Sequence, residues 1–275
     1  MARVRPMLNG VPETLLWTLY NRAYEAGQPY PVIDDPMALQ LVADLDYPFE
    51  ERFGRPNAFH SQAQALRSRC FDLAVEGYLR AHPQATVVAL GEGLETGFWR
   101  VDNGRLNWLT VELPEVAALR RTLLPASDRL RTLTRSATDL SWLDEIEDPV
   151  GRGVAVTTQG LLMYLEPAEV RKILAGCAER LPGGVVVLDS MARRLARGTV
   201  AGTSKVGSMT IPPMRWAMDP RERKKLRSAH PNITEVHALG LPRGRGAMGE
   251  LIRIQHLTPG LRTLTPAMTL LRFGA

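Results

Sequence analysis

Cysteine and long apolar runs are scarce in this sequence. The two cysteines, Cys70 and Cys177, cannot form a framework of disulfides, so we expect a reducing, cytoplasmic environment. No stretch approaches the ~20 apolar residues that a transmembrane helix needs. The basic opening MARVRPMLNG lacks the apolar core of a signal peptide. These features predict a soluble protein without a membrane partner.

Aromatic residues are also few, which bears on nucleic-acid binding. They make up 6% of the chain and are not interleaved with basic residues, although the formal net charge is +5. Single-strand binding relies on bases that stack on aromatic side chains within a basic groove. We therefore interpret residues 221–227 as a solvated helix face and residues 243–246 as a flexible loop, and expect no nucleic-acid partner. The competing hypothesis, an RNA-modifying or nucleic-acid-binding protein, predicts salt-dependent retention of RNA or DNA.

Residues 86–100, TVVALGEGLETGFWR, form the centre of the sequence pattern. Residues 87–90 are apolar without polar alternation, which is typical of a strand buried on both faces of a parallel sheet. The GEG motif at 91–93 follows, and its two glycines permit a sharp turn and the close approach of a ligand. A helix start comes next. This strand, turn and helix predict the nucleotide-binding corner of a doubly wound α/β sheet.

Two further residues narrow the class of nucleotide. Thr96 stands where the third glycine of G-x-G-x-x-G is expected, which argues against a dinucleotide with a pyrophosphate. Glu112 ends a second apolar run about 20 residues later, where a carboxylate accepts hydrogen bonds from ribose hydroxyls. The corner therefore predicts a nucleoside cofactor without pyrophosphate, and S-adenosylmethionine (SAM) is such a cofactor. Methyl transfer from a sulfonium needs no metal, so we expect none.

The distribution of apolar residues predicts one α/β domain over residues 1–275. Helical spacing dominates before the first strand, strands and helices then alternate, and this rhythm is lost after residue 190. Residues 233–238 and 267–273 are candidates for a final antiparallel pair of strands. We expect four regions in this order: a helical cap (1–82), a SAM-binding core (86–190), a lid insertion after the fifth strand (191–232) and C-terminal strands (233–275).

Four motifs in the same order resemble a known family. They are GEGLETGFWR, WLTVELPEV, ATDL and TQGLLMYLEP, and the resemblance runs from about residue 13 to 189 and more loosely through PPMRW. The chain resembles the leucine carboxyl methyltransferase-like family, and more closely its bacterial branch of tetracenomycin-type polyketide O-methyltransferases. The resemblance implies a Rossmann-like, class I SAM-dependent methyltransferase fold with a seven-stranded, mostly parallel sheet.

The resemblance also implies roles for single residues. Arg67 matches the arginine that holds the methionine carboxylate of SAM, Glu112 the acidic ribose ligand, and Gln159 a position near the methionine amino group. Asp139 and Leu140 match the pair beside the adenine, although Asp139 also suits a helix cap. The full set of expected cofactor residues is Arg67, Gly91, Glu92, Gly93, Glu112, Leu113, Asp139, Leu140 and Gln159.

Three positions depart from the family pattern and leave an inactive SAM-binding protein as another hypothesis. Glu95 and Gly97 stand in a motif that is usually Asp-Thr-Arg, so the arginine of that motif is missing. Gln159 replaces a frequent glutamate, although an amide oxygen still accepts a hydrogen bond. SAM binding without methyl transfer to any substrate would favour this hypothesis.

The methyl acceptor is expected to be a small carboxylic acid, aromatic or polyketide-like. A carboxylate is ionised near neutral pH and needs no base, whereas a phenol, the alternative acceptor, benefits from one. His60 is the candidate base, but a lone histidine is more often structural, and we assign no catalytic residue. Expected substrate contacts are Tyr20, Tyr164 and Trp216. A monomer and a homodimer both fit the sequence.

Overall fold

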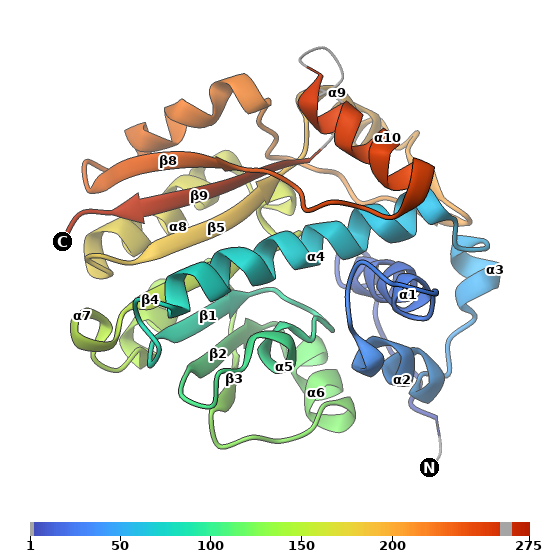
Figure 1. The fold of residues 1–275 in the computed structure, drawn as a ribbon, viewed down its shortest axis with the longest axis horizontal. Helices are drawn as coiled ribbons and strands as arrows, with labels where there is room; N and C mark the ends of the chain where they lie inside the picture. The colour runs from blue at the N-terminus through green and yellow to red at the C-terminus, as the bar shows by residue number, and fades with distance from the viewer. Residues whose placement is uncertain (1–2, 259–265) are drawn as a thin grey trace.

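The computed structural model, which describes residues 3–258 and 266–275, centres on a seven-stranded sheet (Figure 1). The strand order is β3-β2-β1-β4-β5-β9-β8, in which the first five strands are parallel and β9 is antiparallel to both neighbours. This mostly parallel sheet confirms the expected fold class, and its last pair lies where the sequence predicts. The strands are β1 (Thr86–Leu90), β2 (Asn107–Glu112), β3 (Leu130–Thr134), β4 (Val154–Thr158), β5 (Val185–Ser190), β8 (Ile233–Leu239) and β9 (Ala267–Phe273).

The strand order reverses at β1, which pairs with β2 on one side and with β4 on the other. All five residues of β1 are buried, as its unbroken apolar run predicts. In a sheet of this order, a crevice opens at the carboxyl ends of the strands beside the reversal. The chain segments that follow β1, β2 and β4 therefore meet at one edge of the sheet.

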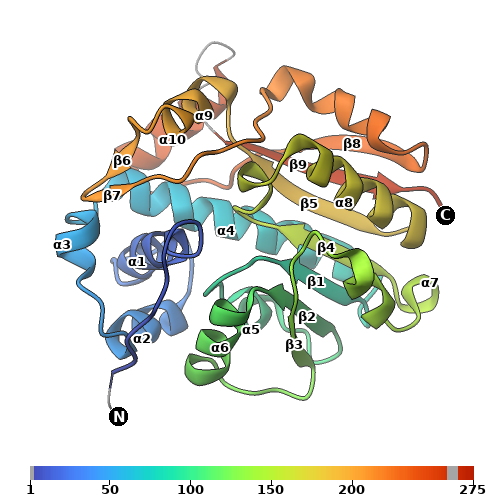
Figure 2. The same cartoon turned by 180° about the vertical axis from the view of Figure 1, so that it is seen from behind.

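Helices cover both faces of this sheet (Figures 1 and 2). Phe71 and Val75 of α4 pack on one face, whereas Val170 and Ile173 of α8 pack on the other. Within the described residues, no helix combines the length and the apolar character needed to cross a membrane. The α-helices outside residues 191–232 are α1 (Thr14–Ala26), α2 (Pro36–Asp44), α3 (Phe49–Phe53), α4 (Ala58–Leu79), α5 (Gly97–Val101), α6 (Pro114–Leu123), α7 (Pro149–Arg152), α8 (Pro167–Arg180) and α10 (Gly246–Leu257). Short 3-10 helices are η1 (Leu140–Glu145), η2 (Leu162–Tyr164) and η3 (Pro220–Ala229).

Residues 191–232 are more regular than their sequence pattern indicates. They contain α9 (Arg193–Val200) and a hairpin of β6 (Lys205–Val206) and β7 (Met209–Thr210) before η3. The hairpin docks on α3, where the amide of Ser208 donates to the carbonyl oxygen of Arg52 at 2.9 Å. Gly207 has a φ of +56°, and a Cβ there would collide with the backbone of α3. The insertion is thus attached to the first helices by backbone contacts, by hydrogen bonds of the Ser208 hydroxyl and by the buried side chain of Met209.

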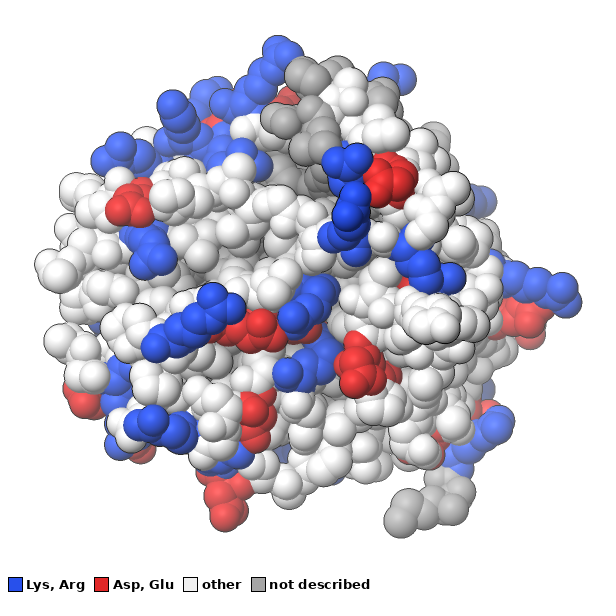
Figure 3. All heavy atoms as spheres, in the orientation of Figure 1, with Lys and Arg blue, Asp and Glu red and all other residues white. Residues whose placement is uncertain are grey.

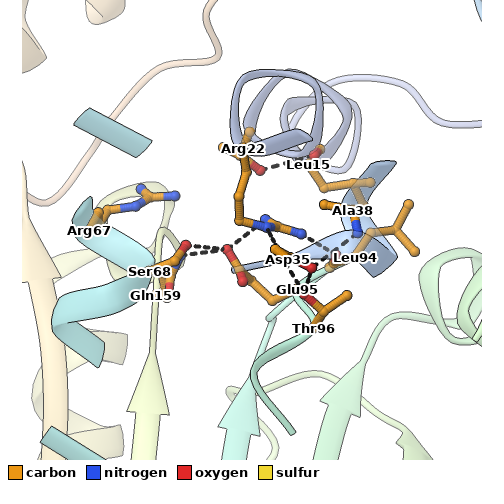
Figure 4. A network of polar contacts seen from close by, with 12 residues as sticks. Leu15, Arg22, Asp35, Ala38, Arg67, Ser68, Leu94, Glu95, Thr96 and Gln159 are labelled. Atoms are coloured by element: carbon orange, nitrogen blue, oxygen red, sulfur yellow. Dashed lines mark hydrogen bonds and ion pairs between the residues drawn. The ribbon is translucent and has the colours of Figure 1, made fainter. Parts of the chain in front are cut away.

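Buried ion pairs fasten the first helices to the turn after β1 (Figure 4). Arg22 of α1 donates from Nε to Asp35 and from Nη1 to Glu95, each at 2.7 Å. Its Nη2 donates to the carbonyl oxygen of Leu94 at 2.8 Å. Asp35 also caps α2 by accepting from the amide of Ala38. One guanidinium group therefore joins α1, the start of α2 and the turn after β1.

Arg100 of α5 completes this network from the other side. It pairs with Asp72 at 2.8 Å, Asp35 at 3.0 Å and Glu95 at 3.1 Å. Burial raises the pKa of Glu95, but the two arginines outweigh it and lower that pKa to about 2. Thr96, which replaces the third glycine, donates its hydroxyl to Asp35 at 2.8 Å. The departure from the glycine motif thus adds a hydrogen bond to the network.

We expect Arg22→Met to lower the free energy of unfolding by about 3–5 kcal/mol, because it leaves buried carboxylates with one partner fewer. Urea unfolding at pH 7 measures this change. Arg55→Met is the matched control: its ion pair with Glu50 is exposed on both sides and should contribute nothing measurable. Equal stabilities for the two variants would show that the fold does not depend on the network.

Candidate cofactor and acceptor site

A cavity of about 730 Å³ opens at the carboxyl ends of β1, β2 and β4. One part of its lining follows these strands and β3, and we call it the strand-end wall (residues 91–95, 111–113, 135–137 and 159–161). The remainder comes from α1, α4, α9, the hairpin and the segments beside them, and we call it the outer wall. A volume of this size is within the usual range for sites that bind small molecules.

The turn after β1 requires glycine for two reasons. Gly91 and Gly93 have φ angles of +60° and +61°, in the left-handed region that favours glycine. A Cβ on Gly93 would lie 2.8 Å from the Cβ of Leu15, and one on Gly91 would lie 2.8 Å from Leu161. The amide of Gly93 donates to Glu112 at 2.5 Å. The turn is therefore held between α1, the segment after β4, and the end of β2.

The two glutamates beside this turn have different surroundings. Glu92 pairs with Arg120 of α6 at 2.7 Å and accepts hydrogen bonds from Thr110 and Trp108 of β2. Its side chain therefore ties the turn to β2 and α6. The carboxylate of Glu112 accepts from the turn itself. Burial raises the pKa of Glu112 to about 7, although Arg120 opposes this shift.

Arg67 reaches from α4 to the carboxyl end of β5. Its Nη1 lies 3.3 Å from Asp189, which also accepts from the amide of Gly160 at 2.8 Å. Gly160 has a φ of +70°, in the left-handed region that favours glycine, and it lies directly beside the guanidinium group. The Nε of Arg67 is buried without a hydrogen-bond partner in the described part of the chain. An orphaned cationic donor in a cavity wall suits an anionic ligand group.

Neighbouring side chains set the orientation of the Gln159 amide (Figure 4). Its Nε2 donates to Glu95 at 2.8 Å and to Ser68 at 3.0 Å. The hydroxyl of Ser68 donates to the same oxygen of Glu95 at 2.7 Å, which leaves its lone pairs free to accept. Gln159 therefore offers its Oε1, an acceptor without a partner among the described residues, to the cavity that it lines.

The outer wall is mainly apolar, with contributions from Trp17, Phe59, Leu195, Met209, Ile211 and Met214. Its polar side chains include His60 of α4 and Lys205 of β6. Lys205 forms no ion pair within the described residues. By contrast, Arg67 pairs with Asp189, and Arg135 lies 3.8 Å from Asp139. The outer wall thus carries an uncompensated positive charge.

The structure brings most of the expected cofactor residues together. Asp139 and Leu140 lie outside the lining: Asp139 caps η1 by accepting from the amide of Ser141 at 3.1 Å, and Leu140 packs toward α8. Ser136 and Ala137, slightly earlier in the chain, line the cavity instead. The expected residues that do line it are Arg67, Gly91, Glu92, Gly93, Glu112, Leu113 and Gln159.

Among the expected substrate contacts, Tyr164 lines the cavity, as does the candidate base His60. Tyr20 instead stacks on Phe49 with ring centroids 5.0 Å apart, in the core of the first helices. Trp216 packs on the core behind the sheet, and its amide donates to Met163 at 3.1 Å. Both aromatic side chains are partly buried against a core and neither lines the cavity, so we do not retain them as substrate contacts.

Comparison with known proteins identifies the family. Residues 16–178 match the model of the leucine carboxyl methyltransferase family. The chain belongs to this family. It is 35% identical to the tetracenomycin polyketide synthesis O-methyltransferase TcmP of Streptomyces glaucescens. The alignment spans 185 residues and covers 67% of each chain. The chain is 33% identical over 180 residues to the S-adenosyl-L-methionine-dependent methyltransferase dpfgK of Gibberella zeae, which covers 61% of this chain and 60% of that one.

A solved structure from Thermobifida fusca YX, provisionally described as a methyltransferase, has the same fold as the present chain. The TM-score is 0.55 at 16% sequence identity, and the match covers 94% of each chain. This protein is a SAM-dependent methyltransferase, and SAM is its cofactor. The site fits that cofactor, because it combines the orphaned donor of Arg67, the available acceptor of Gln159 and the carboxylate of Glu112. The expected family and cofactor are confirmed, whereas the roles of single residues stay predictions.

We predict that Glu112 accepts hydrogen bonds from the ribose of SAM. Glu112→Ala should then weaken SAM binding by about 1.5–3 kcal/mol, the range for hydrogen bonds to a charged group. Titration calorimetry measures the change. Glu115→Ala is the matched control, because Glu115 is an exposed glutamate in the first turn of α6 and does not line the cavity.

The pH dependence of SAM binding tests the same residue. With a pKa raised to about 7, Glu112 takes up a proton in the free protein as the pH falls below neutrality. Cationic SAM and its donating hydroxyls favour the ionised carboxylate, so SAM affinity should rise from pH 6 to pH 8. Glu112→Ala should abolish this rise. The same pH dependence in both proteins would assign it to another group.

Proposed function

We propose that this enzyme is an O-methyltransferase that methylates the carboxylate of a small aromatic or polyketide-like metabolite. The observation that carries this choice is Lys205, an exposed lysine that lines the largely apolar outer wall and forms no ion pair within residues 3–258 and 266–275. Such a wall accepts an apolar ring system, and the ammonium group compensates the charge of a carboxylate on it. The name of TcmP, a relative in polyketide synthesis, supports a polyketide-like acceptor.

We further propose how the strand-end wall, together with Arg67 of α4, holds SAM. Glu112 accepts from the ribose, Arg67 donates from its orphaned Nε to the methionine carboxylate, and Gln159 accepts from the methionine ammonium group through Oε1. When bound, SAM supplies an electrophilic methyl group on a sulfonium. This proposal is supported by a match in hydrogen-bonding character. The two acceptors and one donor on the protein correspond to the ribose hydroxyls, the ammonium group and the carboxylate of SAM.

The chain's contribution to the reaction is placement and exclusion of water. The outer wall holds the acceptor against the strand-end wall, where SAM would bind. An oxygen of the acceptor is then in position for in-line attack on the methyl group. The apolar side chains of this wall remove water from the acceptor, which would otherwise solvate the attacking oxygen. A carboxylate is already ionised near neutral pH, so no side chain has to remove a proton.

A nucleic-acid partner gains no support from the basic stretches. Figure 3 shows basic side chains gathered along η3, but acidic side chains lie among the basic ones on the rest of this face. In η3, Lys225 pairs with Glu222 at 2.8 Å. Arg245, in the expected flexible loop, pairs with the buried Glu25 at 3.2 Å and is held on α1. We therefore propose a small-molecule acceptor; the cytoplasmic location and the oligomeric state stay predictions.

The two acceptor chemistries differ in pH dependence. For a carboxylate with a pKa near 4, the single-turnover rate should be roughly flat from about pH 6 to 9. A phenol that attacks without a base should gain about tenfold per pH unit over that span. A methyl ester product is cleaved by mild alkali, whereas an aryl methyl ether is not. A rate that climbs steadily and gives an alkali-resistant product would replace the carboxylate by the phenol alternative.

Lys205→Met should raise the KM of an acidic acceptor and leave SAM affinity unchanged. The loss is about 1 kcal/mol, or roughly fivefold in KM, because the lysine is exposed at the cavity wall. Lys224→Met, which removes an exposed lysine of η3 away from the cavity, is the matched control. A KM that does not change in the Lys205 variant would remove the main support for a carboxylate acceptor.

A further inference from the structure

One face of α4 carries three polar side chains that line the cavity. His60, Gln64 and Arg67 are spaced four and three residues apart, which places them on the same side of the helix. Arg67 belongs to the cofactor end, and His60 lies two turns earlier, toward the outer wall. The cofactor roles proposed above leave His60 without a function. Its position makes it a candidate contact for the acceptor.

The tautomer of His60 is set by Asn57, the residue that caps α4. Oδ1 of Asn57 accepts a hydrogen bond from the backbone amide of His60 at 2.9 Å. The other atom of the amide group is then Nδ2, which lies 3.0 Å from Nδ1 of the imidazole ring. An amide nitrogen only donates, so Nδ1 must accept. A flipped amide would turn Nδ2 toward the backbone N–H, and two donors would face each other.

With Nδ1 occupied as an acceptor, the ring proton resides on Nε2. A second proton on Nδ1 would point at the Nδ2–H of Asn57, which opposes the charged form. The ring also packs against Trp17, with centroids 6.0 Å apart, and against Phe59, with centroids 5.6 Å apart. The packing of the ring against these side chains partly desolvates it, which lowers the pKa of His60, although the residue as a whole is exposed. His60 is therefore a neutral donor whose Nε2 has no lone pair with which to take a proton.

We propose that His60 binds the acceptor as a hydrogen-bond donor through Nε2–H, in a tautomer fixed by Asn57, and is not the general base of the reaction. The inference rests on the proposed function for the identity of the acceptor. Its ligand is a carbonyl or carboxylate oxygen, because these groups accept without carrying a proton of their own. Asn57 is a positioning residue that acts through His60. A phenol that must lose its proton finds no base at this position.

Nitrogen-15 NMR of histidine-labelled protein tests the tautomer without any acceptor. His60→Gln identifies the signals of His60 by their loss. In the wild type, between pH 7 and 8, we expect a protonated Nε2 and an unprotonated Nδ1. Asn57→Asp should move the proton to Nδ1, because a carboxylate accepts where the amide donated. Asn57→Ser keeps a capping oxygen but removes the amide N–H that faces Nδ1, and it adds no carboxylate, so it controls for damage to α4. A wild-type ring protonated on Nδ1, or one that Asn57→Asp leaves unchanged, would overturn the role of Asn57.

Steady-state kinetics with an acceptor found by a SAM-turnover screen tests the donor. Gln places an amide N–H near the position of Nε2, so His60→Gln should keep the acceptor KM within about twofold. His60→Ala should raise that KM roughly fivefold with little change in kcat, as expected for one lost neutral hydrogen bond. A general base would instead show equal losses in both variants, of about a hundredfold or more in kcat.

The arms of the experiment separate this inference from the proposed function. Alkali-resistant product, with the KM pattern above, would replace the carboxylate acceptor and keep His60 as a donor. Alkali-labile product, with equal kcat losses in His60→Gln and His60→Ala, would keep the carboxylate and overturn the donor. A screen that finds no acceptor at all would overturn the proposed function together with the acceptor contact, while the NMR result still decides the tautomer.

Discussion

The carboxylate of Glu95 is the interaction on which the cofactor end of the molecule depends. It lies in the turn after β1 and is bonded by Arg22 of α1, Arg100 of α5 and the hydroxyl of Ser68 in α4. The same carboxylate receives the amide of Gln159 after β4. One buried charge thereby fixes the first helix against the sheet and sets which atom of Gln159 meets the cavity. In this chain, where Gly97 stands in place of the motif's arginine, the arginines bonded to Glu95 come from α1 and α5.

The strand-end wall could be predicted well from the sequence, because its signals are local. An unbroken apolar run, two glycines and an acidic residue after the next strand define β1, its turn and Glu112, and the structure places all of them at one cavity. The departures in that motif could not be interpreted in the same way. The partners of Glu95 and Thr96 lie in helices up to 73 residues away in the sequence, and no local pattern announces such contacts.

Of the outer wall, Tyr164 could be predicted from the sequence and lines the cavity, but most of its residues could not be predicted, for a physical reason. Tyr20 and Trp216 have large aromatic rings that suit a substrate wall, but such rings also bury much apolar surface, and both pack against a core instead. Asp139 suits a cap and is used as one, so the residues before it line the cavity. Lys205 lies on a two-residue strand whose position depends on the docking of the hairpin. Only the tertiary arrangement distinguishes it from the other lysines.

The hairpin meets α3 through main-chain atoms, with Ser208 and the carbonyl oxygen of Arg52 paired across the seam and a glycine where a side chain would collide. Most substitutions leave a hydrogen bond between two main-chain atoms in place, because the side chain takes no part in it. Ile211, which is only partly buried, can therefore change while the seam keeps the hairpin in place, whereas Met209 is also buried in the core of the first helices. The position of the hairpin over the cavity therefore does not depend on every side chain that the hairpin presents to the substrate. A lineage with this architecture can acquire new acceptors by exchanging a few side chains, without first rebuilding the wall that carries them.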